Sequence, residues 1–436
     1  IRSQVNNPFP SSRLLKVEHP DKPRITGRYG LLAWLSMVPA YAIASVFSPA
    51  PEEAGPAFPS GGDILPLASL LFNPVISGML VALIYLLSRA LGISPWCSLI
   101  AAIIAGFASP IWVYAGTLSS IPLATAFHIA SVLALVHART QHRNFMTLLS
   151  GLLFGLAVST RPDYLMFVPV LLIAVCGIKV IPFPATLWRV VIWILGWVIV
   201  VVPGVGLYNL YRTGDLFDFG YGAQTFLWAT ERAHIGIFGI LASSGFGLFV
   251  YLPVSVLGLW GLLSCSLSRW SRWTMVSPIL VSVLVYGTFN DWEGGVSWGP
   301  RYLTSVVPFL MVGIGCLLWK SRMALSAQFS ICLLSVWGAG ISVLGILFDY
   351  QRGWRNLWDV GARPDQIIWD PHFSPIGAHL RLLRQLLDGS IGPDLYVATR
   401  IGVWSLPIML GLILVIVFWL LQNPVHVSPD RKGSPN

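Results

Sequence analysis

The residues best suited to chemistry lie in one short stretch, DWEGGVSWGPRYL, residues 291–303. It combines two acids, an arginine and aromatic rings: Asp291, Glu293, Arg301, Trp298 and Tyr302. A carboxylate can take a proton from a nucleophile, and an arginine at a helix start is suited to hold a phosphate. The rings could stack on a sugar or a prenyl chain. A polar cluster between two long apolar runs therefore predicts a site for an anionic ligand.

Three further loops have the same mixture of residues. STRPDY (159–164) carries Arg161 and Asp163 on either side of a proline that ends a helix. The loop 208–221 ends in Tyr221, and the stretch 236–251 is rich in glycine and aromatic residues. Single border aromatics and arginines usually serve as interfacial anchors, so the hypothesis of a site depends on the convergence of the whole set.

The composition indicates the environment of the chain. Of its 436 residues, 55% are hydrophobic and only 10% are charged, and the mean hydropathy is +0.73. A soluble protein carries roughly a quarter charged residues, so much of this surface must face lipid. Several apolar runs approach the ~20 residues that cross a bilayer, and no strand-period alternation is visible. We therefore predict an all-α polytopic membrane protein with no nucleic-acid partner, and we interpret the net charge of +9 through membrane topology.

About twelve apolar segments mark the membrane elements. They cover residues 30–48, 67–88, 95–114, 119–138, 146–160, 163–180, 186–210, 246–265, 273–289, 302–319, 326–348 and 401–421. Short basic loops are normally cytoplasmic, and this predicts a cytoplasmic C-terminus. Every Asp and Glu except Asp430 then falls on the outer side. The segment 30–48 either spans or lies in the outer interface.

The segments divide the chain into four parts. Residues 1–66 form a first outer loop with an interfacial helix, and residues 67–349 form a transmembrane core. Residues 350–400 form an outer insert that could bind an acceptor or a protein partner, and residues 401–436 form the last span and an inner tail. Because the sequence opens with Ile1 and a polar stretch, we expect that a preceding segment is missing from it or has been processed away.

The order and the sequences of these loops resemble those of a known family. RYGLLAWLSMVPAY (28–41), WVYAGTLSSIPLATAF (112–127), GLAVSTRPDYLMFVP (155–169) and WEGGVSWGPRYL (292–303) resemble GT-C membrane glycosyltransferases of the protein-mannosyltransferase and aminoarabinose-transferase kind. The resemblance covers about residues 28–385. It implies a fold with about eleven spanning helices in this chain, a horizontal outer-leaflet helix at 30–48 and a first span upstream of Ile1.

The resemblance also implies a reaction. The donor is a polyprenyl-phosphate sugar, a carboxylate is the general base, and basic groups hold the leaving phosphate. Asp21, Asp163, Asp291 and Glu293 are the candidate acids, and Arg28, Arg161 and Arg301 the candidate phosphate ligands. Some members of the family need a divalent metal, so a metal is possible here.

One position departs from the family pattern. Many members carry an acid before the proline of the second outer loop, where this chain has Ile121. Isoleucine can neither accept a proton nor bind a metal, so the base lies upstream, or Asp291 and Glu293 replace it, or the chain is catalytically silent. We therefore predict a glycosyltransferase on the outer side of the membrane. The alternatives are a silent accessory subunit on the same scaffold and, third, a lipid flippase or transporter.

Overall fold

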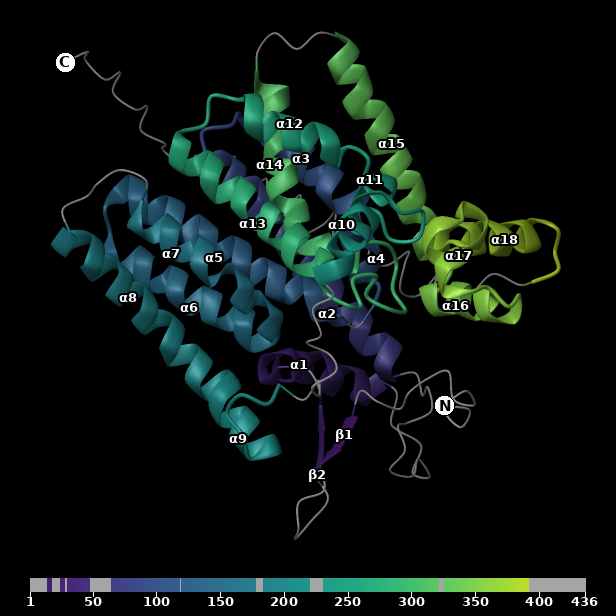
Figure 1. The fold of residues 1–436 in the computed structure, drawn as a ribbon, viewed down its shortest axis with the longest axis horizontal. Helices are drawn as coiled ribbons and strands as arrows, with labels where there is room; N and C mark the ends of the chain where they lie inside the picture. The colour runs from purple at the N-terminus through teal and green to yellow at the C-terminus, as the bar shows by residue number, and fades with distance from the viewer. Residues whose placement is uncertain are drawn as a thin grey trace.

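The computed structural model describes residues 14–17, 24–27, 30–47, 64–117, 119–177, 183–219, 230–320 and 325–391. In this part of the chain, helices form a bundle and two short strands, β1 (Leu14–Val17) and β2 (Arg24–Gly27), form an antiparallel hairpin (Figure 1). The sequence did not predict the hairpin, because a period-two pattern cannot be recognised over four residues. The predicted last span and inner tail, 401–436, lie outside the described residues.

Among the described residues, five stretches are long and apolar enough to cross a membrane: Phe72–Ala90, Ile121–Gln141, Thr186–Thr213, Arg301–Trp319 and Ser326–Leu347. They belong to α2 (Ile64–Ala90), α5 (Ile121–Gln141), the run of α8 (Phe183–Val201), η2 (Val202–Leu207) and α9 (Tyr208–Thr213), the run of η5 (Arg301–Val306) and α14 (Val307–Trp319), and α15 (Leu325–Leu347). Shorter helices fill the rest of the bundle: α3 (Pro95–Phe107), α4 (Pro110–Ala115), α6 (Asn144–Thr160), η1 (Pro162–Phe167), α7 (Val168–Cys176), α11 (Leu248–Tyr251), α12 (Ser255–Ser264) and α13 (Arg269–Gly287). The prediction of a polytopic helical membrane protein is confirmed.

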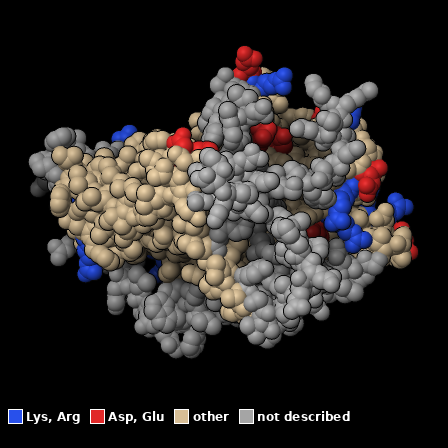
Figure 2. Space-filling view, turned by 90° about the horizontal axis from the view of Figure 1, so that it is seen from below, with Lys and Arg blue, Asp and Glu red and all other residues tan. Residues whose placement is uncertain are grey.

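The exposed side of α8 shows why the chain needs lipid. Trp188, Leu195 and Ile199 on this helix are 57%, 50% and 60% exposed. In Figure 2 the left-hand side of the molecule, where α5 to α8 lie, is a broad surface with no Lys, Arg, Asp or Glu across its middle. An apolar surface of this extent is typical of a face covered by a membrane or a partner.

Proline residues divide several of the predicted segments. The segment 95–114 is two helices, α3 and α4, which meet where Pro110 begins the second helix. The segments that begin at 163 and 302 open with the 3₁₀ turns η1 and η5 before they become α-helical. A further helix, α10 (Ala233–Ala242), follows η4 (Thr230–Arg232) and occupies part of the stretch expected to be an outer loop at 236–251. That stretch is too apolar to remain irregular beside a bilayer.

Helix α1 (Leu31–Phe47) lies across the bundle, as expected for the segment 30–48. Figure 1 shows it oblique to α6 and α8 and close to α9, and it packs against α2, α6 and η2. At its start Gly30 is so close to the end of α6 that an added Cβ would lie 2.1 Å from the Ser159 carbonyl oxygen. The helix therefore packs on the C-terminal end of α6 and on η2, which follows α8.

The described part of the predicted outer insert, up to residue 391, is a compact unit of short helices (Figure 1). These are α16 (Tyr350–Asp359), α17 (Pro364–Trp369), η6 (Pro371–Phe373) and α18 (Pro375–Leu387). The Trp354 indole N–H donates to the Ser297 carbonyl oxygen at 3.1 Å. The Gly245 N–H donates to the Ile368 carbonyl oxygen at 3.0 Å. The insert is therefore bonded directly to the stretch 291–303.

Helices α12 and α14 approach so closely that only glycine fits between them. A Cβ on Gly313 would lie 1.9 Å from the Gly258 carbonyl oxygen, and a Cβ on Gly258 would lie 2.4 Å from that of Leu310. Small residues at such crossings allow the van der Waals packing that holds membrane helices together.

We expect Gly313→Val to destabilise the bundle by about 1–3 kcal/mol or more, because backbone atoms cannot move aside as a side chain can. The measurement is the thermal unfolding midpoint of the detergent-solubilised protein, followed by tryptophan fluorescence. Gly340→Ala is the matched control, since nothing lies within 4 Å of a Cβ there. Equal midpoints for the two variants would contradict the packing argument.

Candidate functional site

The centre of the candidate site is a bend in the chain between α6 and η1. Pro162 cannot continue the helix, and it forces the preceding residue out of the helical region. Arg161 is accordingly extended, with φ −143° and ψ 107°. This conformation turns the Arg161 guanidinium back onto the Asp163 carboxylate: Nη2 donates to Oδ2 at 2.7 Å and Nε donates to Oδ1 at 3.1 Å. The local sequence therefore suffices to form a bidentate ion pair.

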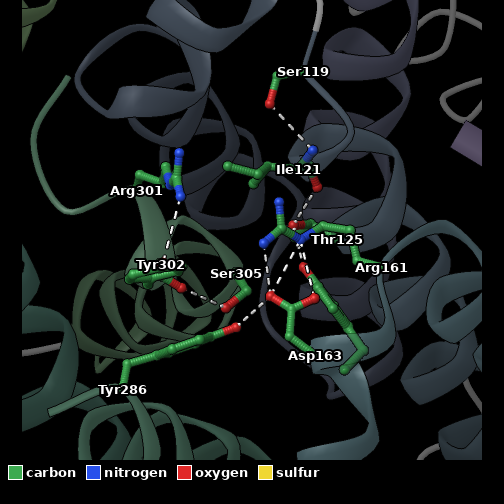
Figure 3. A network of polar contacts seen from close by, with 10 residues as sticks. Ser119, Ile121, Thr125, Arg161, Asp163, Tyr286, Arg301, Tyr302 and Ser305 are labelled. Carbon is green, nitrogen blue, oxygen red and sulfur yellow. Dashed lines mark hydrogen bonds and ion pairs between the residues drawn. The ribbon is translucent and has the colours of Figure 1, made fainter. Parts of the chain in front are cut away.

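A third group holds the carboxylate from the other side. The hydroxyl of Tyr286, at the end of α13, donates to Asp163 Oδ2 at 2.8 Å (Figure 3). The Tyr286 ring stacks on Tyr302 with 4.5 Å between the ring centroids and 10° between the planes. The Arg161 and Asp163 side chains are 15% and 28% exposed, so the pair is enclosed but still accessible.

Arg301 lies beside this network as the first residue of η5. Its guanidinium stands 5.0 Å from the centre of the Tyr302 ring, and Nη2 donates to the Tyr302 hydroxyl at 3.4 Å. Among the described residues, its buried Nε has no hydrogen-bond acceptor, and no carboxylate forms an ion pair with the guanidinium. Gly299, with φ +61°, reverses the chain just before it, a conformation that glycine adopts without strain.

Among its described residues, the site therefore carries one positive charge that no ion pair balances. Arg161 and Asp163 cancel, while Arg301 has no counter-ion among the described residues. Figure 3 shows both guanidinium groups on either side of Ile121, with Ser305 and Thr125 nearby. A buried cation is costly unless an anion pairs with it, so the geometry is suited to bind an anion between the two arginines.

The acids of the opening stretch lie at the edge of the site. The Asp291 side chain is exposed and accepts a weak bond from Asn290 at 3.4 Å, and the described structure shows no ion pair between Glu293 and either arginine. Burial raises the pKa of the half-buried Glu293 carboxyl, and the nearby Asp291 carboxylate adds to the rise. The next residue, Gly294, is so close to Arg301 that an added Cβ would lie 3.3 Å from its Nε. Glu293 therefore belongs to the rim around Arg301.

Trp298 occupies a different position from the one expected for a sugar platform. It is 1% exposed, and its ring contacts Tyr251 edge-on and His379 at 4.4 Å between centroids. Its carbonyl oxygen accepts a bond from the Tyr114 hydroxyl at 3.0 Å. Because its ring is packed against protein, we assign Trp298 a structural role in holding the loop.

The structure thus brings together Arg161, Asp163, Arg301 and Tyr302, with Asp291 and Glu293 at the rim. Three other predicted site residues, Asp21, Arg28 and Tyr221, lie outside the described residues. The sequence did not predict Tyr286 as part of the site, nor Tyr164, whose hydroxyl lies 2.8 Å from that of Thr125. Tyr286 is 123 positions from the acid that it binds, and a lone tyrosine at a helix end is more often an interfacial anchor.

The chemistry of the site also bears on a divalent metal, which some of the enzymes that the sequence resembles need. Among the described residues no group of three or more His, Cys, Asp and Glu side chains could hold a metal ion. Asp163 already accepts bonds from Arg161 and Tyr286, and two arginines nearby would repel a cation. The described residues of the site are therefore suited to an anion rather than to a metal.

No protein-family profile and no curated protein matches the chain. Among solved structures it is similar to ArnT from Cupriavidus metallidurans bound to undecaprenyl phosphate, with 14% identity, a TM-score of 0.46, and coverage of 91% of this chain and 68% of that one. It is also similar to the apo state of the same protein, with 15% identity, a TM-score of 0.47, and coverage of 90% and 68%. A match this distant assigns no residue a role.

The insert that packs on the site contains a pH-sensitive contact. The ring of His379 is buried beside Trp298 and Phe348, and its Nδ1 lies 3.0 Å from the Leu344 carbonyl oxygen, which requires a proton on Nδ1. Burial lowers the pKa of His379 to about 4. Since the folded pKa is depressed, the neutral ring stabilises the fold fully above about pH 6.5, and this contribution is lost as the pH falls toward 4.

We expect the folded protein to lose on the order of 3 kcal/mol between pH 7 and pH 4 through this group. In His379→Gln, whose amide can still donate to the Leu344 carbonyl, this part of the pH dependence should disappear from thermal unfolding curves. His372→Gln, at an exposed position of the same insert, should retain it. A pH dependence unchanged in His379→Gln would show that another group is responsible.

Proposed function

We propose that this chain is a membrane glycosyltransferase that moves a sugar from a polyprenyl-phosphate donor to an acceptor hydroxyl on the extracytoplasmic side. The observation that carries the proposal is the excess positive charge of Arg301 beside the Arg161–Asp163 pair. A lipid phosphate placed between the two guanidinium groups would neutralise this charge and receive charge-assisted bonds. The order of loop motifs that resembles GT-C enzymes supports the same reaction class.

The residues of the site would have different roles in such a reaction. The acceptor oxygen attacks the anomeric carbon, and the bond from that carbon to the phosphate oxygen breaks with its electron pair on the phosphate. Arg301 and Arg161 would stabilise the negative charge that develops there. Asp163 would hold Arg161 in place with the help of Tyr286, and in that role it is a positioning residue because its lone pairs are engaged.

Glu293 fits the role of general base better than Asp163. A base works best when its pKa lies near the operating pH, and burial raises the pKa of Glu293. It adjoins the glycine that contacts both Arg301 and Tyr302. We therefore propose that Glu293 takes the proton of the acceptor hydroxyl, with its pKa raised mainly by burial and further by the nearby Asp291 carboxylate.

The test of the phosphate-binding role is the turnover of Arg301→Ala in membranes, with expression equalised. We expect a loss of about 100-fold or more, the usual effect of removing one donor to a developing charge. Lys320→Ala is the control, because Lys320 follows the other end of the same helix. If Arg301→Ala turns over as fast as the native chain, Arg301 is not part of the site.

The base can be tested by the pH dependence of the rate. Because the base must be ionised, activity should rise with pH through the elevated pKa of Glu293. In Asp291→Asn the neighbouring negative charge is gone, so this pKa falls and the acidic limb of the profile should move to lower pH. Glu293→Gln should abolish the limb together with most of the activity. An acidic limb that does not move in Asp291→Asn would count against Glu293.

One observation favours the accessory-subunit alternative. Ile121, where the related enzymes often have an acid, is 5% exposed and begins α5 at the centre of the site. Its backbone N–H is bonded to the Ser119 hydroxyl at 3.3 Å, so the position is structurally ordered but chemically inert. A native chain that binds polyprenyl phosphate through Arg301 and transfers no sugar would establish this alternative.

A further inference from the structure

A second pair of arginines lies at the opposite end of the helices that build the candidate site. Arg139 in the last turn of α5 and Arg189 of α8 line one pocket, together with Thr147 of α6 and Trp270 of α13. From Thr125 to Arg139 α5 rises by about 21 Å at 1.5 Å per residue. The pocket and the candidate site therefore face opposite sides of the membrane.

The other helices also have the candidate site at one end and the pocket at the other. Helix α6 begins near Thr147 and ends at Arg161, and α13 begins near Trp270 and ends near Tyr286. Helix α7 runs from η1, which holds Asp163, to the pocket wall formed by its last turns. Each of these helices thus joins the Arg161–Asp163 pair at one end to the second arginine pair at the other.

The second pair has no anion among the described residues. No hydrogen bond or ion pair joins Arg139 or Arg189 to any described residue, and the two groups are close enough to repel each other. The stretches 132–158, 168–201 and 253–285, which surround the pocket, contain no Asp or Glu. An anion placed between Arg139 and Arg189 would relieve the mutual repulsion of the two guanidinium groups.

The pocket is ordered rather than formed by loose surface side chains. The Arg139 guanidinium lies 4.8 Å from the centre of the Trp270 ring, and the Trp270 indole N–H donates to the Ala174 carbonyl oxygen at 2.8 Å. The stacked tryptophan restricts the arginine to one direction. Thr147, which is only 4% exposed, also lines the pocket.

The surroundings of Arg189 indicate the kind of anion. The preceding residues on α8, Leu187 and Trp188, are 51% and 57% exposed on the apolar face of the helix. A ligand that reached both arginines from this side would lie with its apolar part along α8. We propose that the pocket binds the phosphate of an anionic phospholipid headgroup, with the acyl chains on the exposed face of α8. Basic pockets between helices at a membrane border bind such headgroups.

The experiment uses the full chain in a neutral detergent, titrated with phosphatidylglycerol, and counts bound lipid by native mass spectrometry. The double variant Arg139→Gln with Arg189→Gln should bind phosphatidylglycerol about tenfold more weakly or worse, because two charge-assisted contacts are lost. Arg143→Gln is the matched control, an exposed arginine near the same helix end that does not line the pocket. Equal affinity of the double variant and the native chain would overturn the proposal.

A second measurement needs no variant. Phosphatidylglycerol should raise the thermal unfolding midpoint of the native chain more than phosphatidylcholine does, because a ligand that binds only the folded state stabilises it. Equal effects of the two lipids would mean that headgroup charge is not recognised. A rise of the same size with inorganic phosphate alone would show that a soluble phosphate, and not a lipid, occupies the pocket.

Discussion

The structure around the candidate site depends on the cost of placing charge near a bilayer. A guanidinium in a water-poor region must be paired or it destabilises the fold. Arg161 meets this requirement locally, since Pro162 turns the chain so that Asp163 follows on the same side. Arg301 does not, and its side chain is instead placed over Tyr302 with Nε enclosed and unbonded. A protein retains such an arrangement when a ligand supplies the missing charge, which is why we centre the function on an anion.

Several distant elements are needed to hold these groups together. Tyr286 links α13 to the Arg161–Asp163 pair, and its stacking on Tyr302 links that pair to η5. The insert adds a bond from Trp354 to the Ser297 carbonyl, within the loop that precedes Arg301. The loop is thus held by contacts with both the bundle and the insert. A conformational change in the insert would therefore alter the position of Arg301. This arrangement connects the insert directly to the loop that carries Arg301.

Each end of the bundle holds two arginines, Arg161 with Arg301 at one end and Arg139 with Arg189 at the other. The residues around the two pairs differ in their chemistry. At one end Arg161 has a carboxylate partner and a ring of tyrosines, which suits a reaction in which negative charge appears and leaves. At the other end Arg139 and Arg189 have apolar neighbours and one tryptophan, which suits a headgroup that stays bound. The same helices carry both, so a lipid held at one end would stabilise the geometry at the other through the rigid helices between them.

The sequence by itself determined the class of fold and much of the local chemistry. Hydropathy placed most helices to within a few residues, because the bilayer fixes their length and composition. Arg161 with Asp163, and Arg301 with its glycine turn, could be recognised because their geometry follows from neighbouring residues. The tertiary structure alone decided that Tyr286 binds Asp163, that Trp298 is packed inside, and that Arg301 has no described counter-ion. Those outcomes depend on contacts between segments that are far apart in the sequence, and no local pattern encodes which helix ends will meet.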